Sequence, residues 1–551
     1  MKTKHIMNCK YSGKSYELNL PTEKKLEPFG TVWFHEDDNH SDKLTQEQKN
    51  LSKKVTKLLE IEYPEQRSKA WFDMRKNCIS ASDGGCVVSY NQHEPPYMIY
   101  LKKLFELPFE PNGACYHGTK LEQIATMVYE YRMNVKIEEF GLVRHPTISC
   151  IGASPDGIIG KYMLNSDKKT KYVGRMLEIK CPKSRQINDK DPFDHIKYYW
   201  VQVQLQLECC DLEECDFWQN IIKEYDNRKE FIEDTSPEEP FRSKTTGMEK
   251  GCLIQLLPKE KMQNITNEVI WGYSKFLYPP RIDMTPLELD VWIAETVNNM
   301  EEYLTQDIYG KNVDIMVGIK MNIMNEEFEK EYLEEIMAKV QSKVDFVLNM
   351  GYKISEKKKK EYYVDILEKM RKDYVTNVSK KLLELKFVKY LITKFKSDLT
   401  FDYNCENLLE KMLDLDLDEE FGEKIRKVEN LKKLCKLMKE LQFAEKYTFH
   451  RVYYWRMEKT HCELVKRDRE WFKLNLPKFE TMWKNILFLR ENKDKAELLK
   501  KYIDSLPTKE VHFEKEIKDN EEVQRFIDIL CNPPDNNVDN DNYKKEISKF
   551  F

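Results

Sequence analysis

Two short stretches, Ser154-Pro-Asp-Gly157 and Leu177-Glu-Ile-Lys180, decide how the middle of this chain folds. Alternation along a strand places Glu178 and Lys180 on one face and the two apolar residues on the other, toward a core. Asp156, at the end of one strand, can meet Glu178 on the next and share a divalent cation. Mg²⁺ prefers hard oxygen ligands and keeps several waters, so two or three carboxylates suffice. Lys180 would then orient or deprotonate a water, or stabilise charge on a phosphate.

The region from about 66 to 300 that surrounds these stretches has a mixed residue pattern. Short β-branched or apolar runs alternate in it with helical stretches, which is typical of an α/β domain. The runs are Ile148–Ile151, Met176–Ile179, Asp216–Ile221 and Cys252–Leu257. We therefore predict an α/β core with a mixed central sheet flanked by helices.

The two ends of the chain differ from this core. Residues 1–65 are predicted to be an extension, with a helix that begins at the capping box Thr45-Gln-Glu-Gln48. The acidic run His35–His40 is interpreted as a solvated loop rather than a metal site. Residues 301–551 are rich in Lys, Glu and Leu and are predicted to be a large all-α domain, with a loose polar tail from about 532. Its apolar residues recur every four positions at Phe328, Tyr332, Ile336, Val340 and Val344.

One further segment, His450-Arg-Val-Tyr-Tyr-Trp-Arg456, mixes basic and aromatic side chains and is followed by Lys466-Arg-Asp-Arg469. Two interpretations stay open for it: contact with nucleic acid, or core aromatics flanked by solvated charges.

Composition excludes several classes of protein. The 551 residues allow about three domains, and 90 basic against 95 acidic side chains give a net charge of −5, so a nucleic-acid-binding surface would have to be a local patch. No stretch approaches the ~18 apolar residues of a membrane span, and the N-terminus does not read as a secretory signal. The 14 cysteines are scattered without a CxxC pair, which favours a reducing compartment. We expect a soluble intracellular protein without a membrane partner.

The spacing Asp156…Glu178-x-Lys180 resembles the PD-(D/E)XK nuclease signature, and its surroundings resemble the YqaJ or phage-lambda-exonuclease type of viral recombination nuclease. Four more elements of that family occur in the same order between about 71 and 207. They are Trp71-Phe-Asp-Met-Arg75, Ile79-Ser-Ala-Ser82, Gly118-Thr-Lys-Leu-Glu122 and Tyr199-Trp-Val-Gln202-Val-Gln204. The resemblance implies a restriction-endonuclease-like core for residues 66–300 and leaves both ends of the chain uncovered.

The resemblance also implies roles for particular residues. It implies a catalytic set of Asp156, Glu178, Lys180 and Gln202; metal ligands Glu122, Asp156, Glu178 and the backbone carbonyl of Ile179; and a DNA phosphate site of Arg75, Ser82 and Ser154. Some of these residues have a structural alternative. Glu122 could close a capping box with Thr119, Ser82 could cap a helix, and Gln202 could be a buried structural amide.

The activity implied is that of a Mg²⁺-dependent DNA nuclease, with Mn²⁺ able to substitute, that digests duplex ends 5′→3′ in recombination, repair or DNA processing. Two alternatives remain: an endonuclease or defence-type nuclease of the same fold, more distantly similar to CRISPR-associated RecB-type nucleases, and a non-catalytic DNA-binding scaffold. Implied partners are double-stranded DNA ends, a single-strand-annealing or helicase protein and further copies of the chain. A large DNA virus would place it in the host-cell cytoplasm.

The cysteines near the site allow a second cofactor to be considered. Cys181 adjoins Lys180, and Cys209, Cys210 and Cys215 follow the Gln-rich helix. CRISPR-associated relatives hold an iron–sulfur cluster on four cysteines, but the spacing here lacks the expected pairs. We therefore expect buried free thiols and no such cluster.

Overall fold

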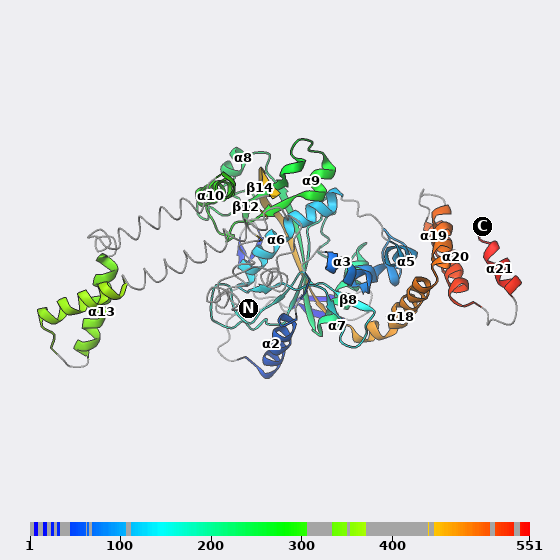
Figure 1. Cartoon of the computed structure of the whole chain (residues 1–551), viewed down its shortest axis with the longest axis horizontal. Coiled ribbons are helices and arrows are strands. Elements are labelled where there is room, and N and C mark those ends of the chain that lie inside the picture. Colours follow the sequence, from blue (N-terminus) through cyan, green and yellow to red (C-terminus); the bar gives the residue numbers. More distant parts are fainter. Residues whose placement is uncertain are drawn as a thin grey trace, which may run out of the picture. The chain divides into compact units, whose positions relative to one another are not determined.

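The computed structural model describes residues 44–61, 63–64, 69–105, 112–305, 333–349, 353–370, 439, 443, 446–506, 513–533 and 540–551, together with four short strands before residue 33 (Figure 1). The described residues fall into two compact units. The first takes in the described parts of 1–255, 266–289 and 452–551, and the second those of 256–265 and 290–451. Every residue predicted for the site lies in the first unit.

Among the described residues, seven strands form the main sheet of the protein. They are β6 (Ile137–Glu138), β9 (Gly157–Ile159), β10 (Met176–Lys180), β11 (Glu214–Glu224), β12 (Lys250–Pro258), β13 (Lys275–Leu277) and β14 (Tyr447–Lys466). Their order is β13-β12-β14-β11-β10-β9-β6. β10 runs parallel to β11 and antiparallel to β9, and β14 runs antiparallel to β11, so the sheet is mixed as predicted.

Short strands form three further sheets in the described part of the chain. β5 (Ile79–Ser80), β8 (Ile151–Ala153) and β7 (Val143–Arg144) pair in that order. Near the N-terminus, β1 (His5–Asn8) pairs with β2 (Ser15–Leu18), and β3 (Lys24–Leu26) pairs with β4 (Gly30–Val32).

Helices cover both faces of the main sheet. Leu177 and Ile179 belong to the core that contains the apolar side of α6 (Gly113–Met133). Met176 and Phe217 belong to a second core, which contains the apolar side of α7 (Lys197–Cys210). The alternation predicted for β10 is therefore confirmed, and Glu178, between Leu177 and Ile179, faces α7.

The remaining helices are shorter or lie toward the ends of the chain. In the first unit they are α2 (Gln46–Leu59), α3 (Lys69–Lys76), α4 (Gly84–Val87), α5 (Tyr97–Leu104), α8 (Arg228–Glu233), α9 (Asn267–Tyr273), α18 (Arg469–Glu491), α19 (Lys493–Ser505), α20 (Phe513–Cys531) and α21 (Asn540–Ser548). Within the described ranges, no helix combines the length and the apolar character needed to cross a membrane.

The all-helical description of 301–551 needs a correction, because residues 447–466 form β14, a strand of 20 residues inside the sheet. Trp455 and Met457 are buried there, so the aromatic run belongs to the core. Its Thr, Val, Tyr and Trp residues have a high strand propensity, and two neighbouring strands satisfy the backbone on both sides. The region after β14 is helical as expected, and α18 packs against α4, α5 and α7. The predicted boundary at residue 300 therefore does not detach this region from the core.

The basic residues that follow β14 have structural partners. Arg467 forms a two-pronged ion pair with Glu208, at 2.6 and 2.7 Å, and Asp468 caps α18. The predicted loose tail also needs a correction, because Asn540–Ser548 is helical. Beyond α21, the ring of Phe550 packs against Phe526 at 4.7 Å between centroids, so apolar burial holds the segment in place.

The N-terminal helix α2 is attached to the core. Thr45 and Gln48 form the predicted capping box. Val55 is buried, and Gln48 Nε2 donates to the backbone oxygen of Lys171 at 3.0 Å. The acidic run His35–His40 lies outside the described residues.

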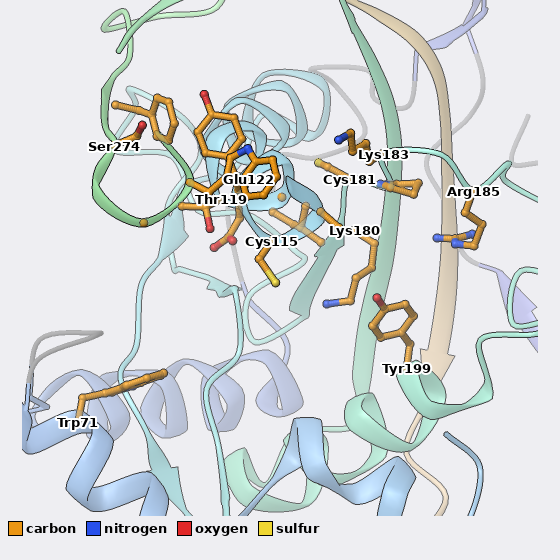
Figure 2. A pocket seen from close by; sticks show the side chains of 18 of the residues that line it. Trp71, Cys115, Thr119, Glu122, Lys180, Cys181, Lys183, Arg185, Tyr199 and Ser274 are labelled. Carbon is orange, nitrogen blue, oxygen red and sulfur yellow. The ribbon is translucent and has the colours of Figure 1, made fainter. Parts of the chain in front are cut away.

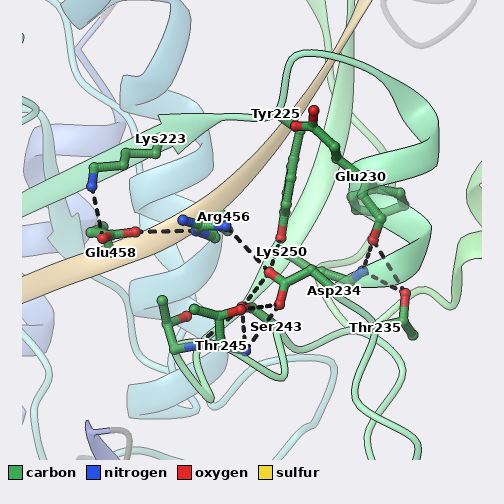
Figure 3. A network of polar contacts seen from close by, with 12 residues as sticks. Lys223, Tyr225, Glu230, Asp234, Thr235, Ser243, Thr245, Lys250, Arg456 and Glu458 are labelled. Atoms are coloured by element: carbon green, nitrogen blue, oxygen red, sulfur yellow. Dashed lines mark hydrogen bonds and ion pairs between the residues drawn. The ribbon is translucent and has the colours of Figure 1, made fainter.

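A network of polar contacts fastens residues 225–250 to the sheet (Figure 3). The carboxylate of Asp234 accepts hydrogen bonds from the hydroxyls of Tyr225 and Ser243, each at 2.6 Å, and lies 3.5 Å from Arg456 of β14. Lys250 Nζ donates to Thr235 Oγ1 at 2.6 Å.

The second unit contains α13 (Leu333–Asn349) and the later part of α10 (Pro286–Thr305). Ile336, Val340 and Val344 of α13 are buried together with Leu367 from the helical residues 356–370. The predicted four-residue period is thus confirmed for these three positions, whereas Phe328 and Tyr332 lie outside the described residues.

Candidate active site

Glu178 lies at the centre of the candidate site. Its side chain is fully buried, and its Oε1 accepts hydrogen bonds from Nζ of Lys180 and from Nε2 of Gln202, the latter at 2.6 Å. Its Oε2 accepts from Nε2 of Gln206 at 2.7 Å. A buried carboxylate is costly unless it is paired and hydrogen-bonded, and these three donors meet that need. The structure thus brings Glu178, Lys180 and Gln202 together.

Gln206 is a residue that the sequence analysis missed. Its Nε2 also donates to the backbone oxygen of Ser154 at 3.2 Å, so it joins the two stretches that decide the fold. Gln206 stands four residues after Gln202 on α7, and this spacing puts both amides on one face of the helix. Gln204 faces elsewhere: it binds the backbone of Lys466 and of Asp468.

Asp156 lies against β10. Its Oδ2 accepts the backbone N–H of Ile179 at 2.6 Å. The pKa of Asp156 lies well above its usual range, first because burial disfavours the charged form and then because Glu178 and Glu122 carry like charges nearby. Three carboxylates therefore act on one another, one from the bend before β9, one from β10 and one from α6.

Neighbouring carboxylates favour the protonated form of Lys180 in this arrangement. Burial lowers the pKa of Lys180, but the carboxylates of Glu178 and Asp156 raise it by more, so the pKa lies above its ordinary value. An ammonium group can donate hydrogen bonds and stabilise negative charge, but it has no lone pair with which to accept a proton. Of the roles considered for Lys180, charge stabilisation and orientation of a water fit this state better than deprotonation.

Arg75 and Ser82 also come together as predicted. Nη2 of Arg75 donates to Oγ of Ser82 at 3.0 Å and to Oγ of Ser80 at 3.2 Å, and the guanidinium lies 4.7 Å from the ring centroid of Trp71. The N-cap in this turn is Ser80, so the helix-capping alternative for Ser82 is wrong. Lys103 holds the backbone oxygen of Arg75 at 2.9 Å.

Ser154 was assigned to the same phosphate site, and no contact joins it to Arg75 or Ser82 in the part of the chain that the structure describes. Its Oγ is buried and has no hydrogen-bond partner there. Its backbone oxygen is held by Gln206. A buried hydroxyl without a partner is unusual and marks a place where a polar ligand or water would fit.

A pocket of about 700 Å³ opens beside β10 (Figure 2). Glu122 from α6, Lys180 from β10 and Tyr199 from α7 line it, and Trp71 from α3 lies at its edge in Figure 2. The other lining residues are Phe72, Ala114, Cys115, Tyr116, Gly118, Thr119, Ile179, Cys181, Pro182, Lys183, Arg185, Trp271, Gly272, Ser274 and Phe276. Carboxylates, cations and aromatic rings thus share one cavity.

The donor set of the site suits a divalent cation. Asp156, Glu178 and Glu122 supply hard oxygen atoms whose mutual repulsion a cation would relieve. As they stand, no three acidic, His or Cys side chains of the described residues are grouped closely enough to hold a metal ion. Both carboxylate oxygens of Glu178 accept hydrogen bonds, from Lys180, Gln202 and Gln206. A cation bound at Glu178 would replace at least one of these contacts.

Of the four cysteines that were considered for a cluster, three are small buried side chains and Cys181 is the exception. Cys209, Cys210 and Cys215 are free and buried, as expected, and burial raises the pKa of the Cys210 thiol to about 12. Cys181 is only half-buried, because it lines the pocket.

Comparison with solved structures finds an alkaline exonuclease from Laribacter hongkongensis, alone and in complex with dAMP. Both are 28% identical to the matched part, which covers 28% and 29% of this chain and 74% and 75% of the other, with a TM-score of 0.21.

Comparison with curated proteins finds an uncharacterized protein of Acanthamoeba polyphaga mimivirus that is 39% identical over 296 residues. The match covers 52% of this chain and 52% of that protein, so the chain spans about half the length of this relative. Neither this match nor those to the solved structures bears on the distant similarity to CRISPR-associated nucleases, which stays a prediction.

Comparison with protein families gives a match over residues 70–213. This segment begins at α3, ends beyond α7 and contains every residue predicted for the site. The resemblance to the YqaJ type, seen in the five sequence motifs, is confirmed: residues 70–213 match a YqaJ-like viral recombinase domain.

Proposed function

We propose that this protein is a DNA nuclease of recombination, and more specifically a Mg²⁺-dependent exonuclease that digests duplex ends in the 5′→3′ direction. The observation that carries the proposal is the clustering of Asp156, Glu178 and Lys180 beside an open pocket, with Gln202 bonded to Glu178. The YqaJ-like viral recombinase domain, which contains all four residues, supports this choice.

Each residue of the cluster has a task in this proposal. Asp156, Glu178, Glu122 and the backbone carbonyl of Ile179 would hold the cation, which supplies charge neutralisation at the scissile phosphate and a more acidic water. Lys180, as an ammonium, would stabilise the negative charge that develops on the phosphate oxygens. Gln202 and Gln206 would keep the Glu178 carboxylate in one orientation.

Arg75 and Ser82 would set the polarity of digestion. A guanidinium offers a fork of N–H donors that matches the oxygens of a terminal phosphate, and hydroxyls add further bonds. The contacts of Arg75 Nη2 with Oγ of Ser80 and of Ser82 support this assignment.

The first experiment titrates Mg²⁺, and Mn²⁺ in parallel, into the protein with end-labelled linear duplex. We expect cleavage that depends on the cation in the wild type and disappears in Asp156→Ala and Glu178→Ala, while both variants still bind DNA in a mobility-shift assay. Near-normal turnover in either variant would refute the assignment of the site.

Polarity is tested on duplexes with a 5′-phosphate or a 5′-hydroxyl. We expect the wild type to digest the 5′-phosphorylated duplex about tenfold faster, since a charge-assisted hydrogen bond contributes about 1.5 kcal/mol or more. Arg75→Ala should lose this preference and Arg75→Lys should retain part of it. Equal rates on both ends, together with cutting of closed circles, would favour an endonuclease of the same fold.

The proposal also includes the binding partners of the protein. They are double-stranded DNA ends, an annealing or helicase protein and further copies of the chain, in the cytoplasm of a host cell.

A further inference from the structure

The wall of the catalytic pocket formed by α9 lies outside the segment that matches the viral recombinase domain. Trp271 of α9 is half-buried and lines the pocket. Its ring approaches the first turn of α6 so closely that a β-carbon at Gly113 would lie 3.3 Å from Cζ2 of Trp271. The same β-carbon would lie 3.0 Å from Nζ of Lys183. An indole ring and an ammonium group therefore meet over Gly113.

This wall is held rigidly by buried polar contacts. The fully buried Gln255 of β12 donates through Nε2 to Oγ of Ser274, directly after α9, at 2.6 Å and to the hydroxyl of Tyr116 at 3.1 Å. Oγ of Ser274 donates to the backbone oxygen of Ile270 at 2.5 Å. Helix α9 is thereby tied to both β12 and α6, which fixes the position from which Trp271 reaches the pocket.

The pocket offers the two surfaces that an unpaired nucleotide needs. Lys183 and Arg185 follow the catalytic strand and line the pocket with positive charge, and Lys183 makes no ion pair with any residue that the structure describes. Trp271 adds a flat apolar surface. A cavity of about 700 Å³ has the size of a site for a small ligand and is too small for a duplex.

We propose that Trp271 stacks on an unpaired base of the strand that is being cut, while Lys183 contacts the phosphate of that nucleotide. The inference rests on the proposed function and adds to it two contact residues, of which Trp271 lies outside the segment that matches the family. Because every base has a flat face, this contact is independent of sequence. Its strength is typical of base–aromatic stacking, which changes affinity by about tenfold for each base.

The test compares Trp271→Phe, which keeps an aromatic ring, with Trp271→Leu, which keeps only apolar volume. Tyr273→Leu on the same helix is the matched control, because Tyr273 is exposed and does not line the pocket. Binding of a short single-stranded oligonucleotide is measured with a chelator present, so that no cleavage is needed. The oligonucleotide carries 2-aminopurine, whose fluorescence falls when the base stacks.

We expect Trp271→Leu to weaken binding about tenfold and to lose the fluorescence quenching, while Trp271→Phe and Tyr273→Leu bind like the wild type. Equal binding and quenching in Trp271→Leu and the wild type would overturn the inference and make Trp271 a wall residue only. Loss of binding in Trp271→Phe as well would also overturn it, because the effect would then not depend on an aromatic face.

The proposed function is judged separately, by cleavage with Mg²⁺. A wild type that quenches 2-aminopurine but never cuts would leave the stacking site in place and refute the nuclease. A wild type that cuts DNA but does not quench 2-aminopurine would support the nuclease and refute the stacking site.

Discussion

At Glu178, one buried carboxylate meets three hydrogen-bond donors, one from its own strand and two from α7. Lys180 follows from the alternation of a strand, and Gln202 from a family motif. Gln206 stands four residues after Gln202, so helical spacing from the glutamine of the motif would have placed it on the same face of α7. The residues of the site could thus be chosen from sequence, but their hydrogen bonds could not.

Gln206→Met tests the importance of this missed residue. It leaves Glu178 Oε2 and the backbone oxygen of Ser154 without their donor, so we expect cleavage to slow by about 10- to 100-fold, as is usual when a partner of a metal-binding group is lost. The free energy of unfolding should fall by about 1–3 kcal/mol, because a buried acceptor loses its bond. Initial rates and urea denaturation measure both quantities. An unchanged rate would mean that Gln202 alone orients Glu178.

Asp156→Asn tests the repulsion among the carboxylates. The pKa of Asp156 is higher in the folded protein than in the unfolded chain, where it is ~3.9. Ionised Asp156 therefore lowers the free energy of unfolding, and this loss grows as the pH rises from ~3.9 through the folded pKa. In a chelator, Asp156→Asn should therefore melt a few degrees higher than the wild type at pH ~8 and show a smaller difference near pH ~4.

The exposed Asp167→Asn serves as the control for this prediction, and its melting temperature should follow the wild type at both pH values. Addition of Mg²⁺ should raise the melting temperature of the wild type more than that of Asp156→Asn, because the cation removes the repulsion that the amide has already removed. A lower melting temperature for Asp156→Asn in chelator would contradict the prediction.

At the level of elements, the position of α7 decides where both glutamines point, and α4 sets that position. A β-carbon on Gly85 of α4 would lie 2.3 Å from Cβ and 2.8 Å from the backbone Cα of Tyr198 in α7. The second distance involves a backbone atom, so the two helices would have to separate to remove this steric clash. Two consecutive glycines here therefore serve a close approach between helices.

Gly85→Ala should reduce the free energy of unfolding by about 1–3 kcal/mol, the usual range for overpacking. It should also slow cleavage, because α7 carries Gln202. Gly118→Ala in α6 is the opposite case, since a β-carbon there would meet nothing within 4 Å. It should raise stability by about 0.5–1 kcal/mol through helix propensity. Thermal melts of the two variants give the comparison, and effects of the same sign would contradict it.

Which elements could be predicted from sequence depended on their neighbours. β10 has a clear alternation, and its partners β9 and β11 lie close in sequence, so the core of the site followed from residues 66–224. β14 has the same kind of alternation at Tyr453, Trp455 and Met457, but the region around it is predicted from sequence to be helical, and its partners lie more than 180 residues earlier. Local pattern alone does not reveal such a pairing.

For the whole molecule, the first unit needs both ends of the described chain. We expect a fragment ending at residue 305 to be insoluble alone, because β11 and β12 would lose the strand between them. Co-expression with residues 446–551 should recover a soluble complex, which size-exclusion chromatography would detect. A soluble, cleaving fragment 1–305 would show that β14 is dispensable.

The place of β14 also has a consequence for synthesis. β12 ends at Pro258 and β14 begins at Tyr447, so a ribosome that adds roughly 5–20 residues per second needs roughly 10–40 s to deliver the missing strand. During that interval the edges of β11 and β12 are open to pairing with other nascent chains. Chaperone demand during translation should therefore be concentrated in this window, and slow codons between the two strands would lengthen it.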